Sequence, residues 1–187
     1  SDDSESQPSS RPCIGIQPWK AITTAAISQT TPAVASVTRI DGVADARAKV
    51  KRLADAGVRV PKPYNFFEGV LLMELVTDAN GDAAPRLNDV AFTPEQACAH
   101  HATLLGEVVR MLGAGIVHGD LSEFNILLGH EDGTAVPVII DLPQAVDAAG
   151  NNHAQRMLLR DVANLRDFFG QFAPELLQTH YGPEIWD

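Results

Sequence analysis

The 187-residue sequence lacks the features that mark several common classes of protein. It contains two cysteines, Cys13 and Cys98, too few for a disulfide framework, and no Cys/His cluster spaced to bind zinc. Lys and Arg number 14 against 24 Asp and Glu, which leaves a net charge of −10. Sequence-independent binding of nucleic acid, or binding to an anionic membrane surface, needs a basic face. We therefore expect neither nucleic acid nor membrane as a direct partner.

Long apolar runs are also missing. No run reaches the roughly 18 residues that a membrane span needs, and no segment has the pattern of a secretory signal peptide. With so few cysteines, this pattern favours a cytoplasmic location. Hydrophobic residues nevertheless make up 45% of the sequence and charged residues 20%, a composition that supports a packed core and excludes disorder of the whole chain.

Composition and periodicity divide the chain into three parts. Residues 1–12 are acidic and rich in Ser and Pro, which predicts a disordered tail. Residues 13–76 contain the strand-like segments, and residues 77–187 are mainly helical. The order of these parts predicts an α+β fold with a small strand-rich N-terminal lobe and a helical C-terminal lobe.

Individual elements follow from local patterns. The first lobe is expected to contain strands over 34–38 and 70–76 and a helix over 43–56. The second is expected to contain helices over 93–112 and 153–169, short strands over 116–117, 126–128 and 136–140, and a short helix after Pro174. Thr93, Pro94 and Gln96 have the pattern of a capping box with proline at the first helical position, which is a strong helix start.

The sequence HGDLSEFNILL, residues 118–128, is the most informative segment. Asp120 and Asn125 lie five residues apart on a predicted loop, the spacing of the protein-kinase catalytic loop. In that chemistry a carboxylate orients the attacking hydroxyl, and a neutral amide oxygen binds Mg²⁺ without adding charge. Asp141, at the end of the next strand, supplies a second carboxylate, and such oxygen ligands suit Mg²⁺ or Mn²⁺. The alternative is a polar loop whose side chains merely satisfy backbone groups.

Several longer blocks resemble the RIO family of atypical serine kinases. They are HGDLSEFNILL, IIDLPQAVD and NNHAQRMLLRDVANLRDFF, together with the upstream AGVRVPKPYNFFEGVLLMELV and APRLNDV. The resemblance covers residues 45–170, and the Asp-Leu-Pro-Gln variant is similar to bacterial members. It implies a protein-kinase-like fold and the ATP- and Mg²⁺-dependent activity of a protein serine kinase or ATPase, with autophosphorylation. It also implies ribosome-assembly factors as partners, although the protein substrate stays unknown.

The resemblance implies roles for single residues of the catalytic segment. Asp120 would be the catalytic aspartate. Asn125 and Asp141 would be the metal ligands, and Asp141 would also be a site of transient phosphorylation. Ser122 would lie beside the phosphates.

The same resemblance implies where the adenine would bind. Met73 would be the gatekeeper residue. Glu74 and Leu75 would form the hinge, whose backbone groups would bind the base. The nucleotide would then lie between the two lobes.

Two parts of a kinase nucleotide site are not recognisable in the sequence. No Gly-rich phosphate loop occurs, and the hydroxyl-rich stretch 22–31 is only a weak candidate. Lys20 is the only lysine well upstream of the first predicted helix, while Ser36 and Ala46 stand where the ATP-positioning lysine and its glutamate partner are expected. The N-terminal lobe is therefore truncated, divergent or inactive. Two alternatives stay open: a non-catalytic nucleotide-binding module and, less favoured, a small-molecule phosphotransferase.

Three further positions have competing interpretations. His118 is interpreted as a structural residue bonded to backbone rather than as a general base. Asp161 either braces the catalytic loop or forms a surface ion pair. The adjacent His100 and His101 are predicted to lie on a solvated helix face, since a metal-binding pair on a helix needs i,i+4 spacing.

Overall fold

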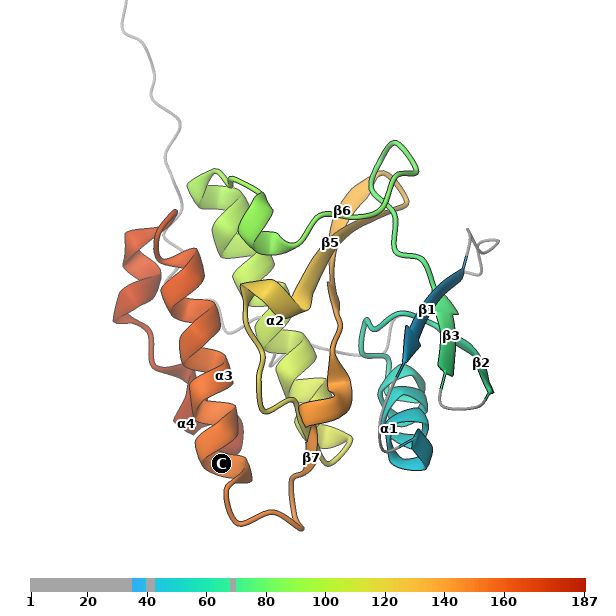
Figure 1. The fold of residues 1–187 in the computed structure, drawn as a ribbon. Coiled ribbons are helices and arrows are strands. Elements are labelled where there is room, and N and C mark those ends of the chain that lie inside the picture. The colour runs from blue at the N-terminus through green and yellow to red at the C-terminus, as the bar shows by residue number, and fades with distance from the viewer. Residues whose placement is uncertain (1–34, 40–42, 68–69) are drawn as a thin grey trace, which may run out of the picture.

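The computed structural model describes residues 35–39, 43–67 and 70–187 (Figure 1). The expectations for the tail, for Lys20 and for the stretch 22–31 lie outside these residues. The side chains of Ser36 and Ala46 also lie outside the described part, although their backbone belongs to described elements.

A three-stranded antiparallel sheet and one helix form the part at the right of Figure 1. Its elements are β1 (Ala35–Arg39), α1 (Val43–Asp55), β2 (Pro63–Phe67) and β3 (Val70–Glu74). The strand order is β1-β3-β2, and the register places Ser36 opposite Met73. Val50 and Leu53 of α1 and Leu71 of β3 are buried, so the helix and the sheet share one core. β3, which leads into the predicted hinge, is therefore the central strand.

Helices dominate the rest of the chain, with two small strand pairs between them (Figure 1). The helices are α2 (Pro94–Gly113), α3 (Ala154–Phe169) and α4 (Tyr181–Trp186). β5 (Ile126–Glu131) pairs with β6 (Thr134–Ile139), and β4 (Ile116–Val117) pairs with β7 (Val146–Asp147). Short 3₁₀ turns lie at η2 (Leu87–Asp89), η3 (Glu123–Asn125), η4 (Leu142–Gln144) and η5 (Pro174–Gln178). The α+β class predicted from the sequence is confirmed.

The start of α2 has the predicted capping box. The Gln96 amide N–H donates to Thr93 Oγ1 at 3.3 Å, and the Thr93 amide N–H donates to Gln96 Oε1 at 2.9 Å. These two bonds satisfy backbone donors that a helix start otherwise leaves open. Within the described residues, none of the helices has both the length and the hydropathy of a membrane span.

Aromatic rings join the segment before α2 to the end of α3 in the main core. Phe92 meets Phe168 and Phe172 edge to face, with ring centroids 6.3 and 5.4 Å apart. Phe169 is fully buried and lies 5.0 Å from the ring of Phe168. Such edge-to-face pairs add roughly 0.5–1.5 kcal/mol each beyond the area that they bury, so this cluster anchors the C-terminal end of α3.

His101 departs from the sequence prediction. It was expected on a solvated face, but only 2% of its surface is exposed. Its ring faces those of Phe169 and Tyr181, at 6.0 and 6.3 Å, because α4 folds back over this side of α2. Its Nε2 has no hydrogen-bond partner among the described residues. Burial lowers the pKa of His101 from 6.5 to about 4.

Replacement of His101 with Leu is expected to flatten the acid dependence of stability. Because the folded-state pKa is depressed, the unfolded chain takes up a proton between pH 6.5 and 4 while the folded chain does not. Stability is therefore lost as the pH falls through this window, by at most about 3 kcal/mol. Urea midpoints measured from pH 7 to pH 4 test this, with His153→Leu, at an exposed position, as the control. Equal pH slopes for the wild type and His101→Leu would contradict it.

Candidate active site

The segment between β4 and β5 forms a loop on which Asp120 is exposed. The side-chain amide of Asn125 donates through Nδ2 to the main-chain oxygen of Asp120 at 2.8 Å, and its distance to Asp120 Oδ2 is 3.4 Å. These contacts orient the amide and leave Oδ1 as its acceptor atom. The loop therefore holds the Asn125 amide oxygen and the Asp120 carboxylate as one unit.

Asp141 is tied to the same loop through the backbone. The amide N–H of Ile140 donates to the main-chain oxygen of Asn125 at 3.0 Å, directly before Asp141. Asp141 itself has φ 63° and ψ 58°, a left-handed conformation that Asp tolerates better than most residues. This turn ends the extended segment and leaves the Asp141 side chain exposed.

His118 connects the loop that carries Asp120 with the segment that ends at Asp141. It is buried, and its Nε2 lies 2.9 Å from the main-chain oxygen of Ile140. Its Nδ1 accepts from the amide N–H of Asp120 at 3.3 Å, so the proton of the ring lies on Nε2, which donates to Ile140. With both ring nitrogens bonded to backbone groups, the interpretation of His118 as a structural residue is confirmed.

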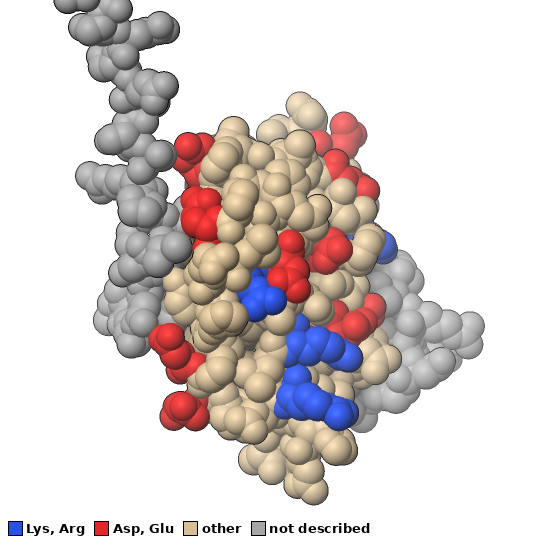
Figure 2. Space-filling model, turned by 90° about the vertical axis from the view of Figure 1, so that its left-hand side faces the viewer, with Lys and Arg blue, Asp and Glu red and all other residues tan. Residues whose placement is uncertain are grey.

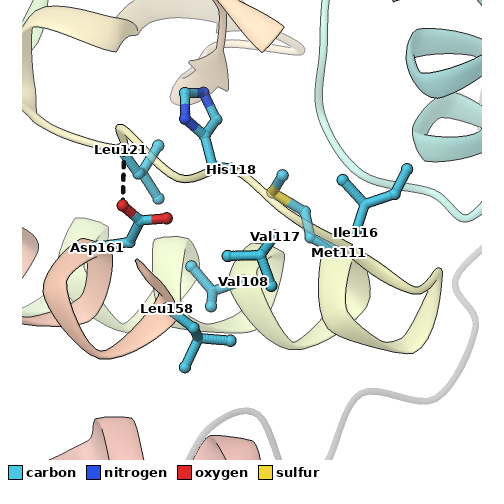
Figure 3. A pocket seen from close by; sticks show the side chains of 8 residues that line it. All are labelled: Val108, Met111, Ile116, Val117, His118, Leu121, Leu158 and Asp161. Atoms are coloured by element: carbon cyan, nitrogen blue, oxygen red, sulfur yellow. Dashed lines mark hydrogen bonds between the residues drawn. The ribbon is translucent and has the colours of Figure 1, made fainter. Parts of the chain in front are cut away.

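Asp161 of α3 braces the catalytic loop (Figure 3). Its two carboxylate oxygens accept from the amide N–H groups of Gly119, at 2.8 Å, and Leu121, at 3.0 Å. Asn164, one turn further along, donates to the main-chain oxygen of Leu121 at 2.9 Å. Burial raises the pKa of Asp161, against the opposing effect of these two N–H donors. Of the two alternatives, bracing is therefore correct, since a buried carboxylate is no surface ion pair.

The apolar floor of the loop is well filled. A cavity of only about 10 Å³ lies beneath it, between α2, β4 and α3. Figure 3 shows His118 and Leu121 above this cavity, with apolar side chains of α2, β4 and α3 around it. The loop is therefore held by hydrogen bonds on one side and close packing on the other.

A cleft of about 340 Å³ separates the β1–β3 sheet from the helical part. Met73, Glu74 and Leu75 line one wall, and Asn125 and Asp141 line another. Apolar side chains form much of the remaining lining: Val50, Leu71, Val76, Leu127, Ile139 and Ile140. A cleft of this size, mostly apolar with a few polar groups at one end, suits a small ligand with a flat ring and a polar tail.

Two of the predicted site residues do not line this cleft. Asp120 lies outside it and contacts it through Asn125. Ser122 is half-buried in the loop, and its main-chain oxygen accepts from the Asn125 amide N–H at 3.0 Å. The cleft therefore unites the predicted hinge with the predicted metal ligands, while Asp120 lies at its border.

The predicted hinge has hydrogen bonds that the sequence did not predict. The amide N–H of Glu74 donates to the main-chain oxygen of Lys62 at 2.8 Å, so it already has an acceptor within the sheet. The Glu74 carboxylate accepts from Arg59 rather than facing a ligand. Val76, the third residue after Met73, also lines the cleft and was not among the predicted site residues.

Arg59 is a structural residue that sequence reasoning missed. Its guanidinium binds Glu74 in a bidentate manner, at 3.1 and 3.0 Å, and also contacts Glu131 of the β5–β6 hairpin. Its amide N–H donates to Glu107 of α2 at 3.0 Å, and its main-chain oxygen accepts from Ile139 at 2.9 Å. One residue thus connects the hinge with α2 and with both strands of the hairpin. No local pattern predicts this, because every partner except its sequence neighbours is distant in the chain.

Replacement of Arg59 with Met is expected to destabilise the hinge. The change leaves Glu74 and Glu131 without their shared cation, in a place where both Arg59 and Glu74 are about three-quarters buried. Loss of a partly buried, charge-assisted pair costs about 2 kcal/mol. Urea unfolding measures this loss, with Lys51→Met as the control because the Lys51–Asp55 pair is exposed. Equal midpoints for the two variants would contradict the role of Arg59.

The oxygen donors in the cleft fit a hard divalent cation. Asn125 Oδ1 and the Asp141 carboxylate belong to the ligand types that Mg²⁺ prefers. Within the described residues, no group of three or more His, Cys, Asp and Glu side chains is arranged to hold a metal ion. Mg²⁺ commonly binds through one or two protein oxygens, with phosphate oxygens and waters completing its shell. The donor set therefore suits a cation that arrives with a phosphate group.

Comparison with known proteins agrees with this geometry. Residues 44–181 match the RIO domain family. The chain is 42% identical over 123 residues to the RIO-type serine/threonine-protein kinase Rio1 of Haloferax volcanii, covering 65% of this chain and 39% of that protein. It is 35% identical over 117 residues to Rio1 of Thermoplasma acidophilum, covering 63% and 57%. The chain thus spans well under two thirds of these relatives.

A solved structure is also similar. The Rio2 kinase of Chaetomium thermophilum, in its complex with ADP, Mg²⁺ and phosphoaspartate, aligns with a TM-score of 0.58 at 30% identity. The alignment covers 67% of this chain and 37% of that one. It supports the predicted protein-kinase-like fold. Since the RIO domain match extends over far more than half of the chain, this protein belongs to the RIO family.

Proposed function

We propose that this chain transfers the γ-phosphoryl group of ATP, with Mg²⁺, to a serine of a protein substrate. The observation that carries the proposal is the single cleft that joins the hinge residues to Asn125 and Asp141, with Asp120 fixed at its border. The relatives named serine/threonine kinases support it. A triphosphate whose base lies against the apolar wall would direct its phosphates toward the polar end.

The roles of the residues follow from their positions. The Asp120 carboxylate would accept the proton of the substrate serine hydroxyl while the serine oxygen forms a bond to the γ-phosphorus. The bond from that phosphorus to the β–γ bridging oxygen breaks, and ADP leaves. Asn125 and Asp141 would hold Mg²⁺, which neutralises phosphate charge when bound. The bond from Asn125 Nδ2 to Asp120 keeps these groups in register.

Autophosphorylation at Asp141 is the second part of the proposal. The Rio2 complex contains phosphoaspartate, and Asp141 is an exposed carboxylate that lines the cleft here. Transfer to its oxygen would form an aspartyl phosphate and release ADP, and water would then return phosphate and the free carboxylate. Such an acyl phosphate is labile to hydroxylamine, whereas phosphoserine is not, so hydroxylamine treatment of labelled protein separates the two products.

The partners and location are proposed from the family alone. Ribosome-assembly factors are the expected protein partners, and the cytoplasm is the expected location. The protein substrate itself has no observation that singles it out. Co-purification from a cell extract, with an Asp120→Asn variant as bait to retain substrates, is the direct approach.

Binding and turnover of ATP are tested together. We expect ATP with Mg²⁺ to raise the melting temperature by several degrees and EDTA to abolish the rise, because binding only to the folded state stabilises it. Labelled γ-phosphate should appear on protein or in solution. Binding without any turnover would support the alternative of a non-catalytic nucleotide-binding module. This alternative has a physical basis, because no ATP-positioning lysine is recognisable in the sequence. Absence of both would refute the proposal.

A further inference from the structure

The face of α3 next to the catalytic loop carries two exposed cations in a strongly acidic protein. Arg156 and Arg160 are both exposed, and their i,i+4 spacing places them on the same face of α3. Figure 2 views the side of the molecule formed by α3 and α4 and shows a row of basic side chains there, with acidic side chains beside part of it. This row contrasts with the net charge of −10 of the whole chain.

The two cations have no ionic partner in the described part of the chain. The ion pairs there engage five other basic residues: Lys51, Arg52, Arg59, Arg110 and Arg166. Arg160 donates a hydrogen bond to a main-chain oxygen, and neither Arg156 nor Arg160 forms an ion pair with a carboxylate of the described residues. The neighbouring Asp161 carboxylate partly offsets the charge of Arg160. Arg156 forms no ion pair with the described residues, so its charge is available to an external anion.

The row of Arg156 and Arg160 begins at the catalytic loop. The guanidinium of Arg160 donates to the main-chain oxygen of Gly119, the residue before Asp120. α3 also contacts η3, where the side chain of Phe124 is 50% exposed. Arg160 and this ring thus lie near Asp120 outside the lining of the cleft, and Arg156 follows one turn away on the same face of α3. A peptide whose hydroxyl reaches Asp120 would lie across it.

We propose that Arg156 and Arg160 bind acidic side chains of the protein substrate, on one side of the serine that is phosphorylated. This inference names the substrate class and rests on the proposed kinase function. Four residues of α-helix separate the two arginines by a rise of about 6 Å, and an extended peptide advances about 3.3 Å per residue. Two acidic residues that are two positions apart, for example at two and four positions from the acceptor serine, would therefore meet Arg160 and Arg156 in turn.

The negative charge of the rest of the protein does not oppose this. At physiological ionic strength the Debye length is about 8 Å, so distant carboxylates are screened while a cation in direct contact is not. Elsewhere on the surface, nearby carboxylates of this acidic protein repel an acidic peptide, whereas the two arginines of this row attract it. It would thus add to specificity rather than cancel the attraction. Single-stranded nucleic acid is the competing anionic ligand, and the net charge makes it less suitable.

The test compares two serine peptides that differ only in acidic or neutral residues flanking the serine at two and four positions. Their kcat/KM values are measured for the wild type, for Arg156→Glu and for the matched control Arg47→Glu, which makes the same change at an exposed position on α1. Fluorescence anisotropy without ATP measures peptide binding independently of turnover. A labelled single-stranded oligonucleotide serves as competitor.

We expect the wild type and Arg47→Glu to prefer the acidic peptide by about tenfold and Arg156→Glu to lose this preference, in turnover and in binding alike. A peptide with lysines at the same positions should then bind Arg156→Glu better than the wild type. An equal preference in Arg156→Glu, or none in the wild type, would overturn the inference, as would an oligonucleotide that displaces the peptide at lower concentration. If acidic peptide binds in this pattern but no variant turns over ATP, the docking surface stands and the kinase proposal fails.

Discussion

Replacement of Asp120 with Asn should lower phosphate transfer at least about a hundredfold and leave the fold intact. A positioned general base contributes roughly 10²- to 10⁴-fold to rate, and Asn cannot accept the proton of the attacking hydroxyl. Asp120 is exposed, and the Asn125 amide binds its main-chain oxygen, which the substitution keeps. Single-turnover transfer of labelled γ-phosphate to substrate measures the loss.

The control is Asp132→Asn, an exposed turn residue with φ 48° where Asn is well tolerated. It should match the wild type in rate and in urea midpoint. Asp141→Asn provides a second comparison, because it should abolish the Mg²⁺-dependent part of ATP binding, whereas Asp120→Asn should keep it. Retention of full turnover by either active-site variant would contradict the roles proposed for Asp120 and Asp141.

Replacement of Asp161 with Ala should both destabilise the chain and slow transfer. It leaves the amide N–H groups of Gly119 and Leu121 without their acceptors in a buried place. Each unsatisfied buried donor costs about 1–3 kcal/mol, so we expect a loss of about 3 kcal/mol in total. The loop that bears Asp120 loses its brace, and displacement of a reacting group by about 1 Å can cost about a hundredfold in rate.

Urea unfolding and the rate of transfer are measured on the same preparations, at temperatures where the variant is folded. Asp167→Ala on the same helix is the matched control, because its exposed side chain pairs, among the described residues, with the adjacent Arg166 alone. A rate for Asp161→Ala equal to that of Asp167→Ala, with the stability loss present, would assign Asp161 to folding alone. Equal stability of the two variants would contradict the bracing role altogether.

Local sequence patterns predicted the elements whose causes are local. α2 begins at the capping box of Thr93 and Gln96, and α3 follows its apolar periodicity, because short-range hydrogen bonds and one buried face decide both. Local sequence patterns predicted the strands less completely. β7 was not predicted, since two residues form a strand only where β4 is already in place to pair with them.

The candidate site likewise has one part that local sequence predicts and another that only the fold decides. The spacing of Asp120, Asn125 and Asp141 is readable because their chemistry demands particular residue types at particular points of one short segment. Their roles remain predictions, and the cleft that contains Asn125 and Asp141 is a property of the fold. The hinge illustrates the difference: Met73 and Leu75 were named from sequence, whereas the bond between Glu74 and Arg59 was not.

By itself, the amino-acid sequence determined the family, the order of the main elements and the position of the candidate catalytic segment, because each depends on residues close together in the chain. Only the tertiary structure decided that His101 is buried and that Arg59 joins the hinge to the hairpin. It also decided that Asp161, and not solvent, accepts the hydrogen bonds of the loop amides. These contacts link residues from different elements, and their free energy depends on burial and on partners that no single segment contains.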